Sequence, residues 1–224
     1  TGDAVTSTNI YLQVVAETAY TNPLFVTLTE VAAANGDQAT PTTFLSVQSD
    51  EARHMANGYA TLAAIASVPD NIPRLQRDFD TAFWRQHCFL DTFIAAVYDY
   101  FQKERGGSYY EAWSEWVGGD WAGAYIERLE PFGVKLPRGW EEAKERVKWA
   151  GHTAMMMFAA TWPMQNVRID PLTAKDFEWF EKKYPGWYGV YGKFWEAYAE
   201  MSDPAKGALP LSLFDGMPPL CRVC

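Results

Sequence analysis

The chain has 224 residues and a formal net charge of −9 at pH 7. Its Lys and Arg residues form no basic stripe, so the composition excludes nucleic acid as an expected partner. Its three cysteines are too few for a disulfide scaffold, which favours a reducing, cytoplasmic setting. The longest apolar stretch, around Thr153–Met164, is shorter than the ~20 residues that span a bilayer, so we expect no membrane segment.

The predicted elements are helices, because long segments without turn signals carry apolar residues at helical spacing. The first is predicted from about Ser7 to Ala33, before Asn35-Gly36-Asp37, where Gly favours the positive φ that ends a helix. The second is predicted from Thr40, as an N-cap followed by Pro41, to about Ser67. The remaining helices are predicted at Pro73–Lys103, Tyr109–Leu129, Trp140–Ala160 and Ala174–Met201, with turns at Gly106-Gly107, Pro131-Phe132-Gly133 and Pro163 and a break at Pro185-Gly186.

Six or seven helices without a sheet predict an all-α bundle. No repeat, low-complexity tract or linker marks a boundary, so we expect one helical domain over residues 1–224. Residues 1–67 would form a pair of helices that carries the candidate site, and residues 68–224 would supply supporting helices. The chain opens on polar residues, so we expect no signal peptide.

The most informative segment for function is Asp50–His54. Glu51 and His54 are three residues apart, so on a helix they share one face and can bind the same metal ion. Asp50 lies four residues before His54 on the same side, close enough to orient the imidazole. Such a Glu-x-x-His helix is half of the ligand set of a carboxylate-bridged di-iron bundle. From the spacing alone, a surface charge cluster with a weak Asp50–Arg53 ion pair is the simpler interpretation.

The first helix offers a further carboxylate in Glu17, which has apolar neighbours one turn away and must reach either solvent or a cation. The hairpin connection makes its helix an antiparallel neighbour of the Glu51 helix. Pro23 cannot donate a backbone hydrogen bond and should distort the helix. Unwinding near Thr21 would turn its hydroxyl towards the metal face, although an ordinary kink with a solvated Thr21 is an equal alternative.

Longer segments are similar to one enzyme family, the bacterial multicomponent monooxygenases, and resemble the large (α) hydroxylase subunit of soluble methane, propane and alkene monooxygenases. The similarity runs over nearly the whole chain, in the same order. The segments are Ala16–Leu24 (AETAYTNPL), Ala32–Asp37 (AAANGD), Ser49–Tyr59 (SDEARHMANGY), Asp176–Glu181 (DFEWFE), Tyr184–Tyr188 (YPGWY) and Tyr191–Lys193 (YGK).

The resemblance implies a ferritin-like di-iron bundle with additional C-terminal helices, of which this chain holds a part. It assigns roles to ten side chains. They are the iron ligands Glu17, Glu51 and His54, the active-site threonine Thr21, the residues Asp50, Arg53 and Asn22 around the ligands, and Tyr20, Leu24 and Phe25 near the substrate pocket.

The resemblance also implies an activity: O₂-dependent hydroxylation or epoxidation of a short-chain alkane or alkene at two iron ions. Electrons would come from NADH through a separate reductase that carries FAD and a [2Fe–2S] cluster. The expected protein partners are a hydroxylase β subunit, a γ subunit in some systems, and a coupling protein. The alternative is a non-catalytic ferritin-like subunit for iron storage or structure, against which the joint presence of Glu17, Thr21, Glu51 and His54 argues.

The ligand set is incomplete, because a full site of this type needs four carboxylates and two histidines. Trp84 and Trp149 stand three residues before His87 and His152, so these two histidines are predicted to lie in a core or an interface. In the family the other ligands lie upstream, which identifies the chain with the C-terminal part of the subunit and predicts that it is inactive alone. Cys88 is predicted as a small core residue, and Cys221 and Cys224 are a weak metal or redox pair.

Overall fold

The computed structural model describes residues 2–102, 104–161 and 169–201, and every regular element in these ranges is helical. The predicted all-α class is therefore confirmed. None of the described helices is both long enough and apolar enough to cross a membrane. The predicted turn at Pro163 and the cysteines Cys221 and Cys224 lie outside the described residues.

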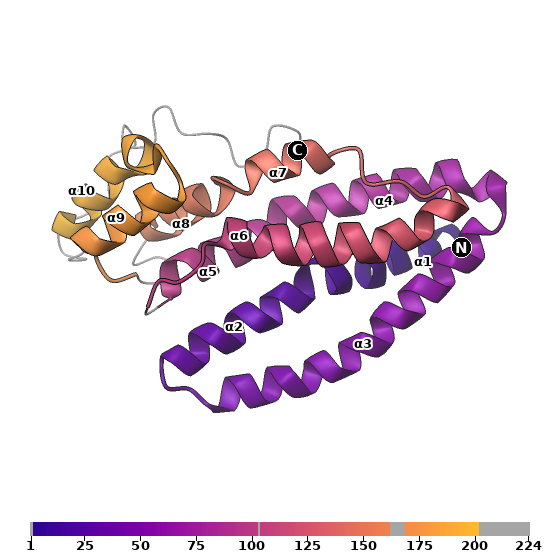
Figure 1. The fold of residues 1–224 in the computed structure, drawn as a ribbon, viewed down its shortest axis with the longest axis horizontal. Coiled ribbons are helices and arrows are strands. Elements are labelled where there is room, and N and C mark those ends of the chain that lie inside the picture. Colours follow the sequence, from indigo (N-terminus) through magenta and orange to yellow (C-terminus); the bar gives the residue numbers. More distant parts are fainter. Residues whose placement is uncertain (1, 103, 162–168, 202–224) are drawn as a thin grey trace.

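The N-terminal third is a hairpin of two long helical arms (Figure 1). The first arm runs without interruption through α1 (Gly2–Asn9), the π-helical segment η1 (Ile10–Thr21) and α2 (Asn22–Ala34). The second arm is α3 (Ala39–Ala66). Gly36, with φ of +85°, makes the turn that the sequence predicts.

The start of α3 differs from the prediction, because the helix begins at Ala39 and the Asp37 side chain, not that of Thr40, binds its first free N–H groups. The Asp37 carboxylate accepts hydrogen bonds from the backbone N–H groups of Ala39, at 2.8 Å, and Thr40, at 3.1 Å. It also accepts one from the Thr40 hydroxyl, at 2.5 Å. These bonds lower the pKa of Asp37. A charged acceptor two residues upstream satisfies the free N–H groups better than a hydroxyl, so the helix begins earlier.

The middle of the chain forms two more long helical arms. The first of them follows a short 3₁₀ turn and contains α4, the π-helical segment η3 and α5 in one continuous run. The second begins at Ser108, where Ser108 and Glu111 form a reciprocal capping box. The bounds are η2 (Pro69–Asn71), α4 (Ile72–Gln86), η3 (His87–Asp91), α5 (Thr92–Phe101), α6 (Tyr109–Trp113), π-helical η4 (Ser114–Ile126) and 3₁₀-helical η5 (Glu127–Phe132).

The helix predicted at Trp140–Ala160 is in fact two helices, α7 (Trp140–Arg146) and α8 (Ala150–Ala160). The backbone leaves the helical region at Trp149, whose φ is −135°. Arg146, which is buried, donates to the carbonyl of His87 and to the hydroxyl of Thr92. These tertiary contacts fix the end of α7, and the turn lets α8 pack along α5.

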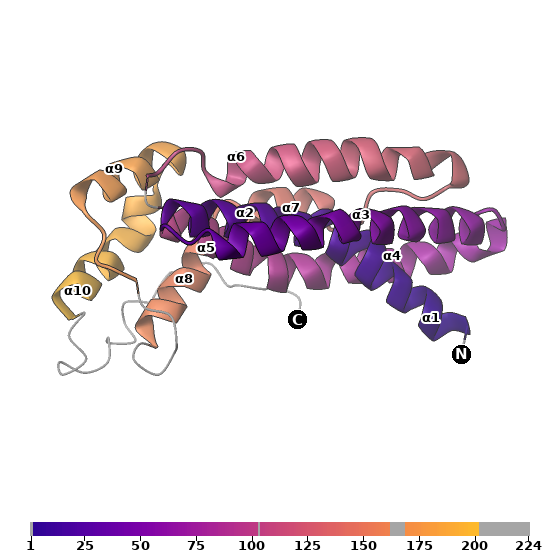
Figure 2. The same cartoon turned by 90° about the horizontal axis from the view of Figure 1, so that it is seen from below.

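The C-terminal part confirms the predicted break at Pro185-Gly186, where Gly186 has a φ of +92°. Helix α9 (Ala174–Lys183) precedes the break, and π-helical η6 (Tyr188–Gly192) and α10 (Lys193–Met201) follow it. Figure 2 shows α8, α9 and α10 gathered at the end of the molecule opposite α1.

The described apolar side chains form two clusters. The first joins η1, α4, η4 and α7 and contains four of the largest buried rings: Tyr20, Phe83, Trp113 and Trp121. The second joins α8, α9, η6 and α10 around Phe180, Trp187 and Trp195. His87 and His152 are buried, which confirms the prediction that they are core residues, whereas Cys88 is only half-buried.

Two contacts hold η1 in place between its neighbours. Trp121 on η4 donates its indole N–H to the carbonyl of Val14, at 3.0 Å. On the other side, Gly58 on α3 lies so close to η1 that a Cβ atom there would be 2.8 Å from the Cβ of Gln13. The small residue therefore sets the spacing between the two helices that carry the candidate site.

We expect Gly58→Ala to destabilise the fold by about 1–3 kcal/mol through overpacking, less the ~1 kcal/mol that alanine gains over glycine within a helix. Urea unfolding of the 224-residue chain measures this. Gly189→Ala is the matched control, because Gly189 is helical and has no neighbour within 4 Å of a Cβ. Equal stability of the two variants would contradict the close approach of α3 to η1.

A second prediction concerns Asp99 on α5, which is buried. It accepts hydrogen bonds from the Tyr109 N–H, at 2.8 Å, and the Tyr184 hydroxyl, at 2.6 Å. Burial raises the pKa of Asp99 from 3.8 to about 7, against the opposing effects of these bonds and of the Arg105 charge. The folded state thus holds this proton more tightly than the unfolded chain does.

Asp99 should therefore stabilise the fold most at low pH, and this contribution should be lost as the pH rises from 3.8 towards about 7. The test is the free energy of unfolding across this range for wild type and for Asp99→Asn, which cannot ionise. We expect the difference between the two to shift in favour of the variant as the pH rises. A difference that is constant with pH would contradict the raised pKa.

Candidate metal centre

Three side chains from the two arms of the N-terminal hairpin converge on one point. Glu17 comes from η1, and Glu51 and His54 come from one face of α3. One ligand atom from each lies within 4.8 Å of the others. His54 Nδ1 is 3.1 Å from Glu51 Oε2 and 3.5 Å from Glu17 Oε2. Glu17, Glu51 and His54, called the cage below, are close enough together to bind one cation.

The electrostatics of the cluster favour a cation at its centre. Burial and the negative charge of Glu51 raise the pKa of Glu17, and His54 opposes the shift. One carboxylate oxygen of Glu17, Oε2, is buried and has no hydrogen-bond partner. Two facing carboxylates with an unsatisfied oxygen are stabilised when a positive ion lies between them.

The donor set fits iron. Carboxylate oxygens and an imidazole nitrogen are ligands that non-haem iron accepts, and no thiolate is among them. The side chains of Glu17 and Glu51 are only 20% and 15% exposed, whereas that of His54 is 49% exposed. The cage is therefore closed by the hairpin and open on the His54 side.

The helix that carries Glu17 is π-helical, not α-helical, on both sides of this residue. The π-helical hydrogen bonding extends from Ile10 to Thr21 and returns to α-helix at Asn22, just before Pro23. Thr18 donates its hydroxyl back to the carbonyls of Gln13 and Val14. The predicted distortion near Thr21 is present, but as the wider turns of a π-helix and not as unwound backbone. Thr21 is half-buried and is the last residue of this π-helical segment.

The residues predicted around the ligands lie in different environments. Asp50 and Arg53 form an ion pair of 3.4 Å in which both side chains are largely exposed. Asn22 is half-buried, and its side-chain carbonyl accepts a hydrogen bond from Gln48, at 2.5 Å. Sequence reasoning missed Gln48, although it precedes Glu51 by three residues and so lies on the same face of α3.

The three residues predicted near a substrate pocket are apolar neighbours of the site. Tyr20 is fully buried in the first core cluster, and its hydroxyl has no hydrogen-bond partner. Leu24 packs on the same cluster. Phe25 contacts Phe44 of α3, with ring centroids 5.2 Å apart and ring planes tilted by 34°. Of the three, Phe25 contacts the second arm of the hairpin, whereas Tyr20 faces Phe83 of α4 in the core.

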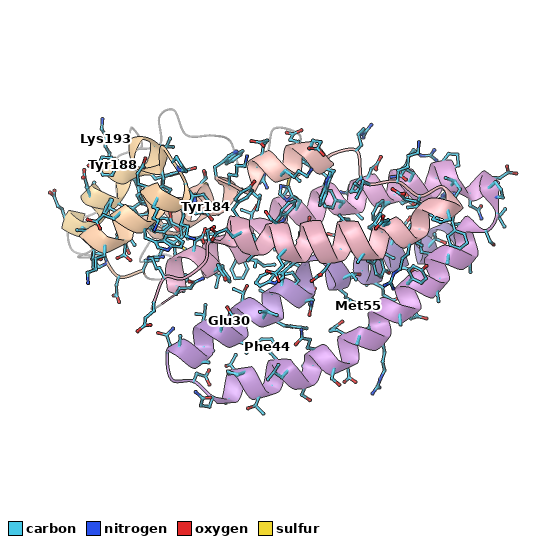
Figure 3. The ribbon with its side chains drawn as sticks, in the orientation of Figure 1. Glu30, Phe44, Met55, Tyr184, Tyr188 and Lys193 are labelled. Atoms are coloured by element: carbon cyan, nitrogen blue, oxygen red, sulfur yellow. The ribbon has the colours of Figure 1, made fainter. Side chains whose placement is uncertain are left out.

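A cavity of about 210 Å³ lies beside the ligand helices, between η1, α3 and η4. Thr18 lines it from η1 and Asn22 from the start of α2, and Met55, directly after His54, lines it from α3 (Figure 3). The η4 side is made of Trp116 and Tyr125 among others. Sequence reasoning missed these η4 residues, because nothing in their spacing indicates which helix would cover the site.

Comparison with known proteins finds similar sequences among hydrocarbon monooxygenases. The family described as Methane/Phenol/Alkene Hydroxylase matches residues 1–69. The large subunit of the propane 2-monooxygenase hydroxylase component of Rhodococcus jostii is 47% identical over 212 residues, which are 92% of this chain and 39% of that protein. The methane monooxygenase component A alpha chain of Methylococcus capsulatus is 41% identical over 95% of this chain and 41% of its own length.

Comparison of the fold with solved structures also finds a hydroxylase. The crystal structure of xenon-pressurised phenol hydroxylase from Pseudomonas sp. OX1 superimposes with a TM-score of 0.82 at 28% identity, over 92% of this chain and 42% of that one. This confirms the predicted ferritin-like helical bundle. The chain spans about two-fifths of the length of the relatives that it matches. Sequence and fold together show that this chain is homologous to the large hydroxylase subunits of the bacterial propane and methane monooxygenases.

Proposed function

We propose that the chain supplies one iron ion's share of a carboxylate-bridged di-iron centre in a hydrocarbon monooxygenase. The convergence of Glu17, Glu51 and His54 within 4.8 Å, from two different helices, is the observation that carries this proposal. A surface charge cluster needs no such convergence. The buried Glu17 oxygen, which lacks a hydrogen bond and has only a 3.5 Å contact with His54 Nδ1, supports a metal over a purely structural ion pair.

In this proposal Glu17, Glu51 and His54 hold iron, and bound iron supplies the activation of O₂. The two carboxylates balance the positive charge, and the imidazole completes the protein ligands on one side. Thr21, at the end of η1, would hold or move a proton with its hydroxyl. The apolar neighbours Tyr20, Leu24 and Phe25 would exclude water and receive a short-chain alkane or alkene.

The remaining ligands would come from polypeptide outside this sequence. Only Gly58, Leu62 and Ala66 are buried on α3, a helix of 28 residues. His54 is half-exposed, so the open side of the cage has room for further ligands. A second Glu and a second Glu-x-x-His helix laid along this face would complete a ligand set of four carboxylates and two histidines.

The proposed reaction needs electrons and partners that this chain does not provide. We propose a separate NADH-dependent reductase with FAD and a [2Fe–2S] cluster, a hydroxylase β subunit with or without a γ subunit, and a coupling protein. The relatives named as hydroxylase components of multicomponent systems support this assignment. Propane is the favoured substrate class, because relatives at 46–47% identity are named propane 2-monooxygenases.

The second candidate is a non-catalytic ferritin-like subunit that stores iron or serves as a scaffold. It shares the helical fold, so the fold does not discriminate between the two. Measurements of metal loading and of oxygen-dependent turnover discriminate between the candidates, because only a catalytic subunit uses its bound metal to oxidise a substrate.

We expect Glu51→Ala, made in the complete hydroxylase subunit with its reductase and coupling protein, to abolish iron loading and hydrocarbon oxidation. The alanine removes one of the three ligands that this chain offers. Iron content by elemental analysis and product formation measure the two effects. Glu30→Ala is the control, since Glu30 is an exposed carboxylate on α2 away from the cage (Figure 3). Unchanged turnover in Glu51→Ala would reject the proposal.

For the 224-residue chain alone, we expect no intact di-iron centre. Three protein ligands on one open side should bind at most one divalent ion, and weakly. Titration with Co²⁺, followed by its visible absorption, measures this, and Glu17→Gln should weaken the binding while Glu30→Gln should not. Two tightly bound iron ions per isolated chain would show that the ligand set is complete without further polypeptide.

A further inference from the structure

The first core cluster contains a row of oxidisable rings that begins at the metal-ligand helix. Trp121 is hydrogen-bonded to η1 itself, through the carbonyl of Val14, three residues before Glu17. The ring centroids of Trp121 and Trp140 are 6.1 Å apart, and those of Trp140 and Trp113 are 5.3 Å apart. All three rings are buried, so no water separates them.

The row ends at a buried carboxylate. Asp91, on η3, accepts hydrogen bonds from the Trp113 indole N–H, at 2.9 Å, and from the Tyr109 hydroxyl. His87 Nδ1 lies 2.6 Å from the same carboxylate, so an imidazole donor holds it in position. Asp91 is 1% exposed. Three donors on one buried carboxylate satisfy it and fix its position in the core.

The hydrogen bonds give the row a direction. A Trp or Tyr side chain that loses an electron becomes a strong acid, and it keeps the hole only where its proton can leave. Trp121 donates to a backbone carbonyl, which cannot take a proton, and the Tyr20 hydroxyl has no partner at all. Tyr109 and Trp113 donate to a carboxylate, which can. An oxidising equivalent is therefore most stable on the rings that donate to Asp91, Trp113 and Tyr109.

We propose that Trp121, Trp140, Trp113 and Tyr109 form a relay that draws oxidising equivalents away from the metal site. An oxidant at the site takes one electron from Trp121 and is reduced by one electron. Electrons from Trp140 and then Trp113 refill each oxidised ring in turn. Tyr109 supplies the last electron and passes its hydroxyl proton to Asp91, which leaves a neutral tyrosyl radical beside a carboxylic acid.

Such a relay would protect the site when a strong oxidant forms without substrate to consume it. The inference rests on the proposed iron chemistry only for the natural source of the oxidant. The test of the relay supplies its own oxidant and needs no iron. A negative result would therefore leave the proposed metal site standing, and a chain that binds no iron could still be tested for the relay.

The chain itself offers the attachment point for that test. Of its three histidines, His87 and His152 are 1% and 2% exposed, whereas the His54 side chain is 49% exposed. A ruthenium bis(bipyridine) imidazole complex should therefore bind His54 selectively, at the metal site. A laser flash with an irreversible electron acceptor converts the label to Ru(III), a one-electron oxidant.

In the labelled chain we expect Ru(III) to be reduced, a Trp radical absorption to appear, and a tyrosyl radical to follow in freeze-trapped EPR spectra. The tyrosyl radical should form more slowly in D₂O, because the O–H proton moves to Asp91. Tyr109→Phe should abolish this tyrosyl signal and leave a Trp radical. Trp113→Phe should slow the appearance of the tyrosyl signal, because it removes the ring between Trp140 and Tyr109.

Tyr184→Phe is the matched control. Tyr184 is also a buried tyrosine hydrogen-bonded to a buried aspartate, Asp99, but it lies in the second core cluster, away from Met55 and the site (Figure 3). Its loss should leave the signal unchanged. A tyrosyl signal that survives in Tyr109→Phe, or that is lost in Tyr184→Phe, would overturn the relay. So would a wild-type radical that forms equally fast in D₂O, a result that needs no variant to fold.

Discussion

Two helices can bring charged side chains to one point only if their backbones lie close together, and in this chain that approach depends on Gly58. Its missing side chain leaves room for Gln13, so α3 lies against η1 within a spacing that no larger residue allows. Trp121 holds η1 from the opposite side through the Val14 carbonyl. Glu17 faces Glu51 and His54 because η1 is fixed between these two contacts.

The consequence is that two negative carboxylates lie together with one imidazole beside them. Two carboxylates, one of them with a buried oxygen that lacks a hydrogen bond, face a half-exposed imidazole, and the outer face of α3 lacks a neighbour over most of its described length. The opposite face of η1 meets a dense aromatic core. One helix thus separates a polar, open cage from a dry interior in which Asp91 is the carboxylate that two oxidisable rings share.

Much of the fold followed from local patterns. The Gly36 and Gly186 turns were predictable because their positive φ values suit glycine. The Thr40 cap was wrong because the Asp37 carboxylate binds the N–H groups of Ala39 and Thr40, so that the helix starts before Thr40. The single helix Trp140–Ala160 was wrong because tertiary bonds of Arg146 end it early. The first error overlooked a capping side chain close by in the sequence, and only the second arose where a tertiary contact outweighed helix propensity.

The sequence by itself determined the chemistry of the candidate site. Spacing put Glu51 and His54 on one helix face, and the hairpin made Glu17 their neighbour. Only the tertiary structure decided which atoms meet. It placed the Glu17 oxygen near His54, the Gln48–Asn22 bond, the exposed Asp50–Arg53 pair and the donors around Asp91. Spacing along a helix fixes direction within one element, whereas distances between elements depend on how side chains from distant parts of the chain pack.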